Sequence, residues 1–285
     1  MLLFAKMIIR GDIMVFLQNF LFQILFSVGL IIIFGFLIAA LNRSWCRMLG
    51  SKGMFAMRAT GVIGTPIHEI GHAIFCIIFG HKIVEMKLYS MDTSTGVLGY
   101  VNHSYNKKNI YHVIGNFFIG VGPIVFGSLV LMLLMWLLIP ATFVKVFSSL
   151  GQVSELSFDV FNLDTYAQMG AMFLNTVTSI FSFSNFGSWQ WWVFIVLGIL
   201  IATHMTLSKA DVDGSKLGFV ILLLIYLIVD GIIFLISPSL LIAMTSVIVK
   251  FSFYILSLLM LGIIVLLLLL ILTFVLGGFK LRRNY

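Results

Sequence analysis

Long apolar runs constrain the fold of this chain more than any other feature of its sequence. The runs cover residues 13–41, 54–80, 111–139, 189–208, 216–236 and 240–278. A helix needs about 20 apolar residues to cross the hydrocarbon core of a bilayer, so each run is long enough for one crossing. Only 9% of the residues are charged and the mean hydropathy is +1.16, values that exclude an ordinary soluble domain. The sequence therefore predicts an all-α polytopic membrane protein with about six transmembrane helices.

Positive charges indicate how these spans cross the membrane. If the N-terminus lies in the cytosol, eleven Lys and Arg residues fall in the inner segments and five in the outer loops. Basic residues gather on the cytosolic side of membrane proteins, so we expect a multi-pass protein of the cell membrane with a cytosolic N-terminus. The net charge of +7 comes from residues that flank the spans, and a nucleic acid is therefore not an expected partner.

The chain is expected to form a single membrane-embedded domain over residues 1–285, because it contains no internal repeat and no separate soluble segment. Residues 141–188 are predicted as an outer loop that caps the bundle or lies along the membrane interface. The last run, 240–278, contains Lys250 and is compatible with either one long helix or a tight hairpin.

The second run carries an ionisable motif inside an apolar helix. His68, Glu69 and His72 form H-E-x-x-H, and the i, i+4 spacing places both imidazoles on one helix face, where they can hold one zinc ion. Glu69 can then accept a proton from the water that zinc acidifies. The alternative is a set of buried polar residues that satisfy one another. Ionisable groups cost about 2.5–3.5 kcal/mol each at the membrane centre, which favours a functional role.

Two histidines leave a catalytic zinc in need of a third protein ligand. Asp211 and Asp213 follow the fourth run, in the segment HMTLSKADVDG. With a helical rise of about 1.5 Å per residue, both aspartates can reach the depth of His72, whereas Asp230 lies too far out. Asp211 is also spaced to pair with Ser208, so a helix cap is the alternative role.

Two strand-like segments lie between the second and third runs. KIVEMKLY and GVLGYVNH are rich in β-branched and aromatic residues, and the turn-rich MDTST joins them. We expect a small β-hairpin within residues 81–110 on the cytosolic side. An edge strand can hold an extended polypeptide through main-chain hydrogen bonds, and Gly99, Tyr100 and Val101 are therefore candidate substrate-binding residues. The alternative is a connector that only covers the neighbouring site.

With these residues identified, the chain resembles the site-2 protease family of intramembrane zinc metalloproteases. The likeness covers residues 54–236, a protease-like core. It rests on HEIGH with Gly71, on GNFFIGVGPIVFG with the Gly122-Pro123 pair, and on the Asp-Gly region after the fourth run.

The third motif departs from the family pattern N-x-x-P-x-x-x-x-D-G. When Asp213 is aligned, Met205 and Ser208 stand at the Asn and Pro positions. The segment is closer to a divergent bacterial branch of the form H-M-x-L-S-x-x-D, which implies Asp211 as the third ligand and Asp213 as the alternative. The family's carbonyl-polarising Asn has no matched position here, and the candidates for that role are Asn116, Thr203 and His204. A ligand role or simple packing is equally open for His204.

The resemblance implies a zinc-dependent intramembrane endopeptidase that hydrolyses membrane-embedded or membrane-adjacent polypeptides with zinc-activated water. Its cofactor would be Zn²⁺, and its partners would be a membrane protein or peptide substrate and the lipid bilayer. The alternatives are a membrane transporter and a non-catalytic relative that binds membrane peptides. Transporters commonly show paired repeats, which this chain lacks. A non-catalytic relative would have no chemical need for Glu69.

Overall fold

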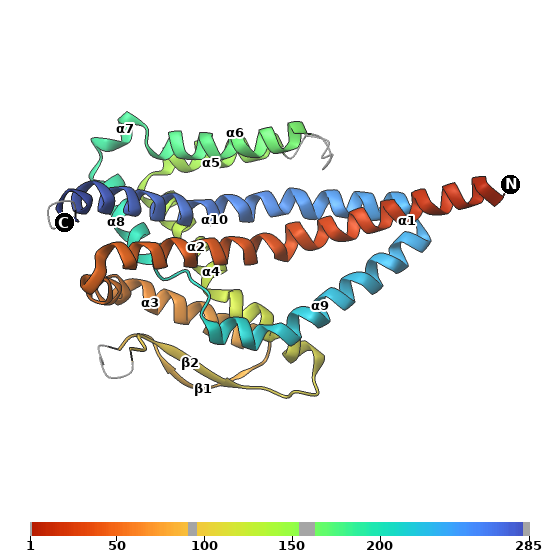
Figure 1. The fold of residues 1–285 in the computed structure, drawn as a ribbon, viewed down its shortest axis with the longest axis horizontal. Coiled ribbons are helices and arrows are strands. Elements are labelled where there is room, and N and C mark those ends of the chain that lie inside the picture. Colours follow the sequence, from red (N-terminus) through yellow and green to blue (C-terminus); the bar gives the residue numbers. More distant parts are fainter. Residues whose placement is uncertain (1, 91–95, 154–162, 282–285) are drawn as a thin grey trace.

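A computed structural model of the chain describes residues 2–90, 96–153 and 163–281. The chain folds into helices with one small antiparallel sheet (Figure 1), as the sequence predicts. The elements are α1 (Leu2–Ile24), a π-helical turn (Leu25–Gly29), α2 (Leu30–Leu49), a 3-10 turn (Gly50–Lys52), α3 (Gly53–Ile78), β1 (Lys82–Lys87), β2 (Tyr100–Ser104), α4 (Ile110–Leu138), α5 (Pro140–Val153), α6 (Leu163–Ile180), α7 (Phe183–Phe186), α8 (Trp189–Ala202), α9 (Lys209–Ile236) and α10 (Pro238–Leu281).

Within the described part of the chain, four segments are long and apolar enough to cross a membrane. They are Asp12–Ile78, which contains α3 and most of the helical structure before it, then Ile110–Leu138, Lys209–Ile236 and Ile255–Leu276. These helices are consistent with the predicted membrane protein, whereas the expected count of six spans is not confirmed. The fourth apolar run forms only the 14-residue helix α8, because the backbone leaves the helix after Ala202. The last run forms one long helix, α10, and not a hairpin.

The chain reverses direction between α2 and α3 at Gly50. Its φ of 56° lies in the left-handed region, which glycine adopts without the penalty that a Cβ atom brings. The two helices then run side by side (Figure 1). The main apolar core forms where α2, α4, α8 and α10 meet, and it contains Ile38, Leu131, Phe194 and Leu266.

Small residues bring α4 into close contact with both α3 and α9. A Cβ atom at Gly71 would lie 2.8 Å from Pro123 Cα, so the backbones of α3 and α4 touch at this point. A Cβ atom at Gly120 would collide with the Ser215 side chain of α9, and one at Gly218 would collide with the α4 backbone. Such small-residue contacts are typical of helices packed in membranes. Helix α4 therefore holds the HEIGH helix and α9 at fixed positions on its two sides.

The predicted hairpin is present and runs alongside α3 (Figure 1). Strands β1 and β2 are antiparallel, with a bulge between Ile83 and Glu85. The Tyr89 hydroxyl donates a hydrogen bond to the carbonyl of Arg58, near the start of α3, at 2.9 Å. The hairpin therefore extends back along most of the length of α3. The predicted turn MDTST, residues 91–95, lies outside the described residues.

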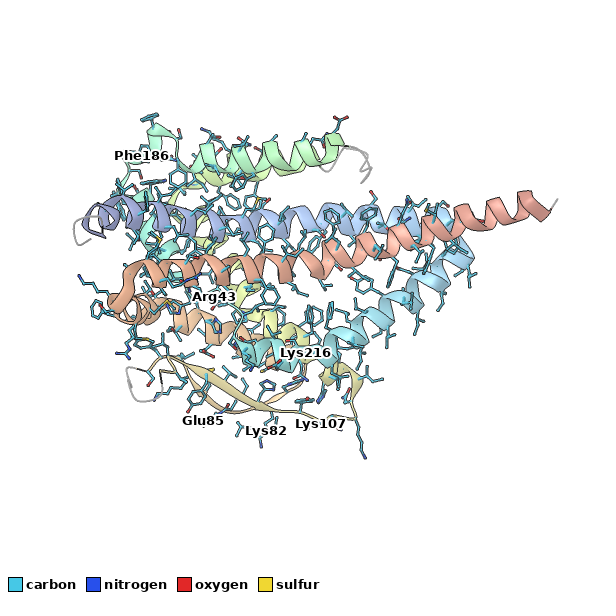
Figure 2. All side chains as sticks on the ribbon, in the orientation of Figure 1. Arg43, Lys82, Glu85, Lys107, Phe186 and Lys216 are labelled. Carbon is cyan, nitrogen blue, oxygen red and sulfur yellow. The ribbon has the colours of Figure 1, made fainter. Side chains whose placement is uncertain are left out.

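The two sides of the hairpin differ in what they face. Figure 2 shows Lys82, Glu85 and Lys107 on the side turned away from the helices. The Tyr100 hydroxyl donates a 2.6 Å hydrogen bond to Glu85 across the strands, and this bond raises the pKa of Tyr100. Gly99, which immediately precedes β2, lies against Glu69 of α3, since a Cβ atom at Gly99 would lie 2.9 Å from Glu69 Cγ.

The segment expected as an outer loop, 141–188, contains helical structure in its described part. Helices α5 and α6 lie side by side along one flank of the bundle (Figure 1), and the short α7 leads on to α8. Asn185 ties this region together by donating to the carbonyls of Ser179 and Ile180 at 2.9 and 3.0 Å.

Candidate metal centre

The two histidines of the HEIGH motif point their Nε2 atoms at each other, 3.1 Å apart. Each ring uses its other nitrogen for a backbone carbonyl: His68 Nδ1 lies 2.7 Å from the His204 oxygen and His72 Nδ1 lies 2.7 Å from the Ile119 oxygen. A carbonyl oxygen only accepts hydrogen bonds, so both Nδ1 atoms must carry a proton. In its neutral form each imidazole therefore has its lone pair on Nε2, the tautomer that a metal ion requires.

The Ile119 carbonyl is available because of the proline one turn later. In an α-helix this oxygen would accept the N–H of residue 123, but Pro123 has no N–H to donate. The same Gly122-Pro123 pair is the place where α4 touches Gly71 of α3. The glycines let the helices approach, and the proline leaves a carbonyl unpaired at the contact. His72 uses that carbonyl.

The carbonyl that orients His68 belongs to the turn after α8. Asn42 Nδ2 donates to the Thr203 carbonyl at 2.5 Å, which fixes this turn against α2. The His204 ring contacts two hydroxyls of α3, with Nε2 3.0 Å from Thr60 Oγ1 and Nδ1 3.3 Å from Thr65 Oγ1. The sequence left the His204 ring open as a ligand or an oxyanion donor. In the structure, both of its nitrogens contact threonine hydroxyls. Its backbone oxygen is what reaches the site.

Asp211 provides the third donor. Its Oδ1 lies 3.3 Å from His72 Nε2, and one donor atom each from His68, His72 and Asp211 fall within 4.8 Å of one another. The other oxygen, Oδ2, accepts the Ser208 N–H at 2.8 Å, while Ser208 Oγ accepts the Asp211 N–H at 3.1 Å. This reciprocal pair is a capping box at the start of α9. The sequence offered a helix cap and a metal ligand as alternative roles for Asp211. The cap uses Oδ2 and leaves Oδ1 directed at His72, so one carboxylate can serve both roles.

The other aspartates are engaged or placed elsewhere. Asp213 Oδ1 is paired with Lys216 Nζ at 2.6 Å, and both side chains are exposed. Asp230 is buried farther along α9 and is not part of the cluster. The structure therefore brings Asp211, and neither of the other two, to the histidines.

The cluster has the chemistry of a cation site. Three donor atoms converge here, and with both rings neutral a positive ion would offset the repulsion between their lone pairs. Two imidazole nitrogens and one carboxylate oxygen form a donor set that zinc takes in catalytic sites, where a fourth position stays open. The residues present fit Zn²⁺.

Comparisons with family models, curated proteins and solved structures found no match to this chain. The resemblance to the site-2 protease family therefore rests on the motif residues alone and stays an expectation from the sequence.

Glu69 lies beside the donor set and is 95% buried, since its exposed fraction is 5%. Within the described part of the chain its carboxylate has no hydrogen-bond or ion-pair partner. Glu69 and the three donors line one cavity of about 450 Å³. The other lining residues are Val97, Gly99, Tyr100, Val101, Asn102, His103, Asn116, Ile119, Gly120, Ser208, Ala210 and Gly214.

The cavity contains most of the residues expected from the sequence. Gly99, Tyr100 and Val101 line it from the hairpin, and Asn116 lines it from α4. His103 also lines it and was missed, because a single histidine in a short strand carries no motif.

We expect Asp211→Ala to weaken zinc binding by at least about 100-fold, because even groups that only support a metal ligand typically contribute 10- to 100-fold. Asp213→Ala should leave the affinity unchanged, since it removes only an exposed pair with Lys216. Zinc affinity would be measured by chelator competition on purified protein in detergent.

Because Asp211 also caps α9, Ser208→Ala is the matched control: it removes the cap and keeps the donor. Capping residues contribute about 0.5–2 kcal/mol to stability, so this variant should be less stable but bind zinc. Loss of zinc in Asp213→Ala alone would show that the Asp-Gly register of the site-2 proteases applies here.

Proposed function

We propose that this chain is a zinc-dependent intramembrane endopeptidase that cuts membrane-embedded or membrane-adjacent polypeptides. One observation carries the proposal: His68, His72 and Asp211 converge in a cavity that also contains the unpaired carboxylate of Glu69. A structural cluster would need the three donors but not the carboxylate. The motifs and this arrangement favour a divergent relative of the site-2 proteases, with the N-terminus in the cytosol.

Each residue has a distinct task in the proposed reaction. Bound zinc would act as a Lewis acid that polarises the scissile carbonyl and acidifies water. Glu69 takes a proton from the water molecule while the water oxygen attacks the carbonyl carbon. Glu69 then delivers that proton to the amide nitrogen when the C–N bond breaks. The capping box and the two carbonyls hold Asp211, His68 and His72 in place, so little reorganisation is needed.

The scissile carbonyl also needs a polarising group, and geometry separates the three candidates. Asn116 lines the cavity from α4. The Thr203 hydroxyl donates to the Ile199 carbonyl at 2.9 Å within α8, and the His204 ring is engaged by Thr60 and Thr65. We assign the role to Asn116.

The hairpin suits an extended substrate. Residues 99–103 line the cavity along a strand whose main chain can pair with an added polypeptide. A transmembrane helix must unwind before it is cut, and a strand beside the metal centre would hold the unwound part. Such pairing depends on the backbone and not on a particular side-chain sequence.

The test is cleavage by purified, zinc-loaded protein of a library of transmembrane and juxtamembrane peptides in detergent, read by mass spectrometry. We expect hydrolysis that stops when a zinc chelator is added and returns when zinc is restored. Zinc binding without any cleavage would favour the non-catalytic peptide-binding alternative. Zinc transport into proteoliposomes without cleavage would favour a transporter.

A further inference from the structure

A second group of histidines lies where the hairpin meets the helices, outside the metal donor set. His81 follows α3, His103 belongs to β2 and His112 belongs to the first turn of α4. His81 Nδ1 lies 3.0 Å from His103 Nδ1, and His81 Nε2 lies 2.8 Å from the His112 carbonyl oxygen. The Tyr105 ring stacks on His81 with 4.8 Å between the ring centres.

These contacts fix the tautomers of His81 and His103. His81 Nε2 must donate, because the His112 carbonyl can only accept. His81 is buried, and burial lowers its pKa, so the ring is neutral at neutral pH and its Nδ1 carries a lone pair. His103 Nδ1 must then be the donor in the bond between the two rings.

His103 is consequently left with one unused ring atom. Burial is the main cause that lowers its pKa, and the nearby His81 and His72, which would repel a second positive charge, lower it further, so this ring is also neutral at neutral pH. Its Nδ1 proton is committed to His81, and its Nε2 carries a lone pair without a partner in the described part of the chain. His103 lines the same cavity as Glu69.

A polypeptide held in that cavity brings main-chain N–H groups that need acceptors once they leave water. The main chain of β2 can accept some of these N–H groups, whereas in the proposed reaction the donor set binds the metal and Glu69 takes the proton of water. We propose that His103 Nε2 accepts a hydrogen bond from a main-chain N–H of the bound polypeptide, and that His81 is the positioning residue that holds this tautomer. The inference rests on the proposed function and adds a substrate-binding residue to it.

The experiment compares two ligands on the full-length, zinc-loaded protein in detergent. Acetohydroxamate can chelate zinc and has no peptide beyond its chelating group, whereas an N-acetyl-dipeptide hydroxamate adds main-chain N–H groups. The dissociation constants of both are measured for wild type and for His103→Asn. Asparagine can place its amide nitrogen near the position of Nδ1 and keep the bond to His81, but it has no atom at the position of Nε2.

We expect His103→Asn to weaken binding of the dipeptide hydroxamate by roughly three- to tenfold, the range for one neutral hydrogen bond. The affinity for acetohydroxamate should stay unchanged. His81→Phe should do the same, because it keeps an aromatic ring against Tyr105 but removes the acceptor. His81→Asn should restore binding, because its side-chain oxygen can replace Nδ1 as the acceptor.

The outcomes separate this inference from the proposed function. If acetohydroxamate does not bind wild type, the zinc site fails and the inference fails with it. If acetohydroxamate binds and His103→Asn holds the dipeptide hydroxamate as tightly as wild type does, only the inference is overturned. If His103→Asn weakens both ligands equally, His103 supports the fold and not the substrate, which also overturns it.

Discussion

Glu69→Gln is expected to keep the fold and the zinc while lowering the rate of peptide hydrolysis by at least about 10²- to 10⁴-fold, the usual contribution of a general base. The amide is nearly isosteric with the carboxylate, so the buried contact with Gly99 is preserved. It cannot accept a proton from water. Zinc content and initial cleavage rates would be measured on the same preparations.

The matched control is Glu85→Gln. Glu85 is exposed on β1, outside the cavity, and its main partner is the Tyr100 hydroxyl. The Glu85→Gln variant should retain the wild-type rate of peptide hydrolysis to within a few-fold. An active Glu69→Gln enzyme would refute the general-base role and favour the transporter interpretation.

Removal of either motif histidine should empty the metal site. We expect about one zinc per chain in wild type and almost none in His68→Ala or His72→Ala. Two imidazoles on one helix face chelate the ion together, and removal of either ring abolishes that chelation. Metal content by mass spectrometry after dialysis against a weak chelator would test this. The elution profile in detergent would confirm that both variants remain folded.

His112→Ala serves as the control for loss of a histidine. Its ring lies outside the donor set, and the bond from His81 goes to its backbone oxygen, which the substitution keeps. This variant should bind zinc as wild type does. Unchanged metal content in both His68→Ala and His72→Ala would defeat the metalloenzyme proposal.

Local patterns in the sequence explain which features were predictable. Apolar length identified the membrane character, and the i, i+4 spacing put His68 and His72 on one face because that relation is internal to a single helix. The depth estimate placed Asp211 near the histidines, where the structure also has it, since helical rise is nearly constant. The capping spacing of Ser208 and Asp211 was also visible, although its compatibility with a ligand role was not.

Features that depend on contact between elements were not predictable. The pairing of His72 with Ile119 requires both the missing N–H of Pro123 and the close approach of α3 and α4, and only the first is written in the sequence. The orientation of the His204 ring depends on the turn that precedes α9. The predicted count of six spans is not confirmed, and α8, with 14 residues, is shorter than the apolar run from which a span was predicted.

The division of the donors between two helices has a consequence for regulation. His68 and His72 move with α3, whereas Asp211 moves with the first turn of α9, and α4 lies between them. A displacement of α9 would shift one donor and leave the other two in place. In the proposed zinc site, metal binding and the position of α9 would therefore be thermodynamically linked. A lipid, partner or substrate that shifts α9 would weaken zinc binding, and bound zinc would oppose that shift by the same free energy.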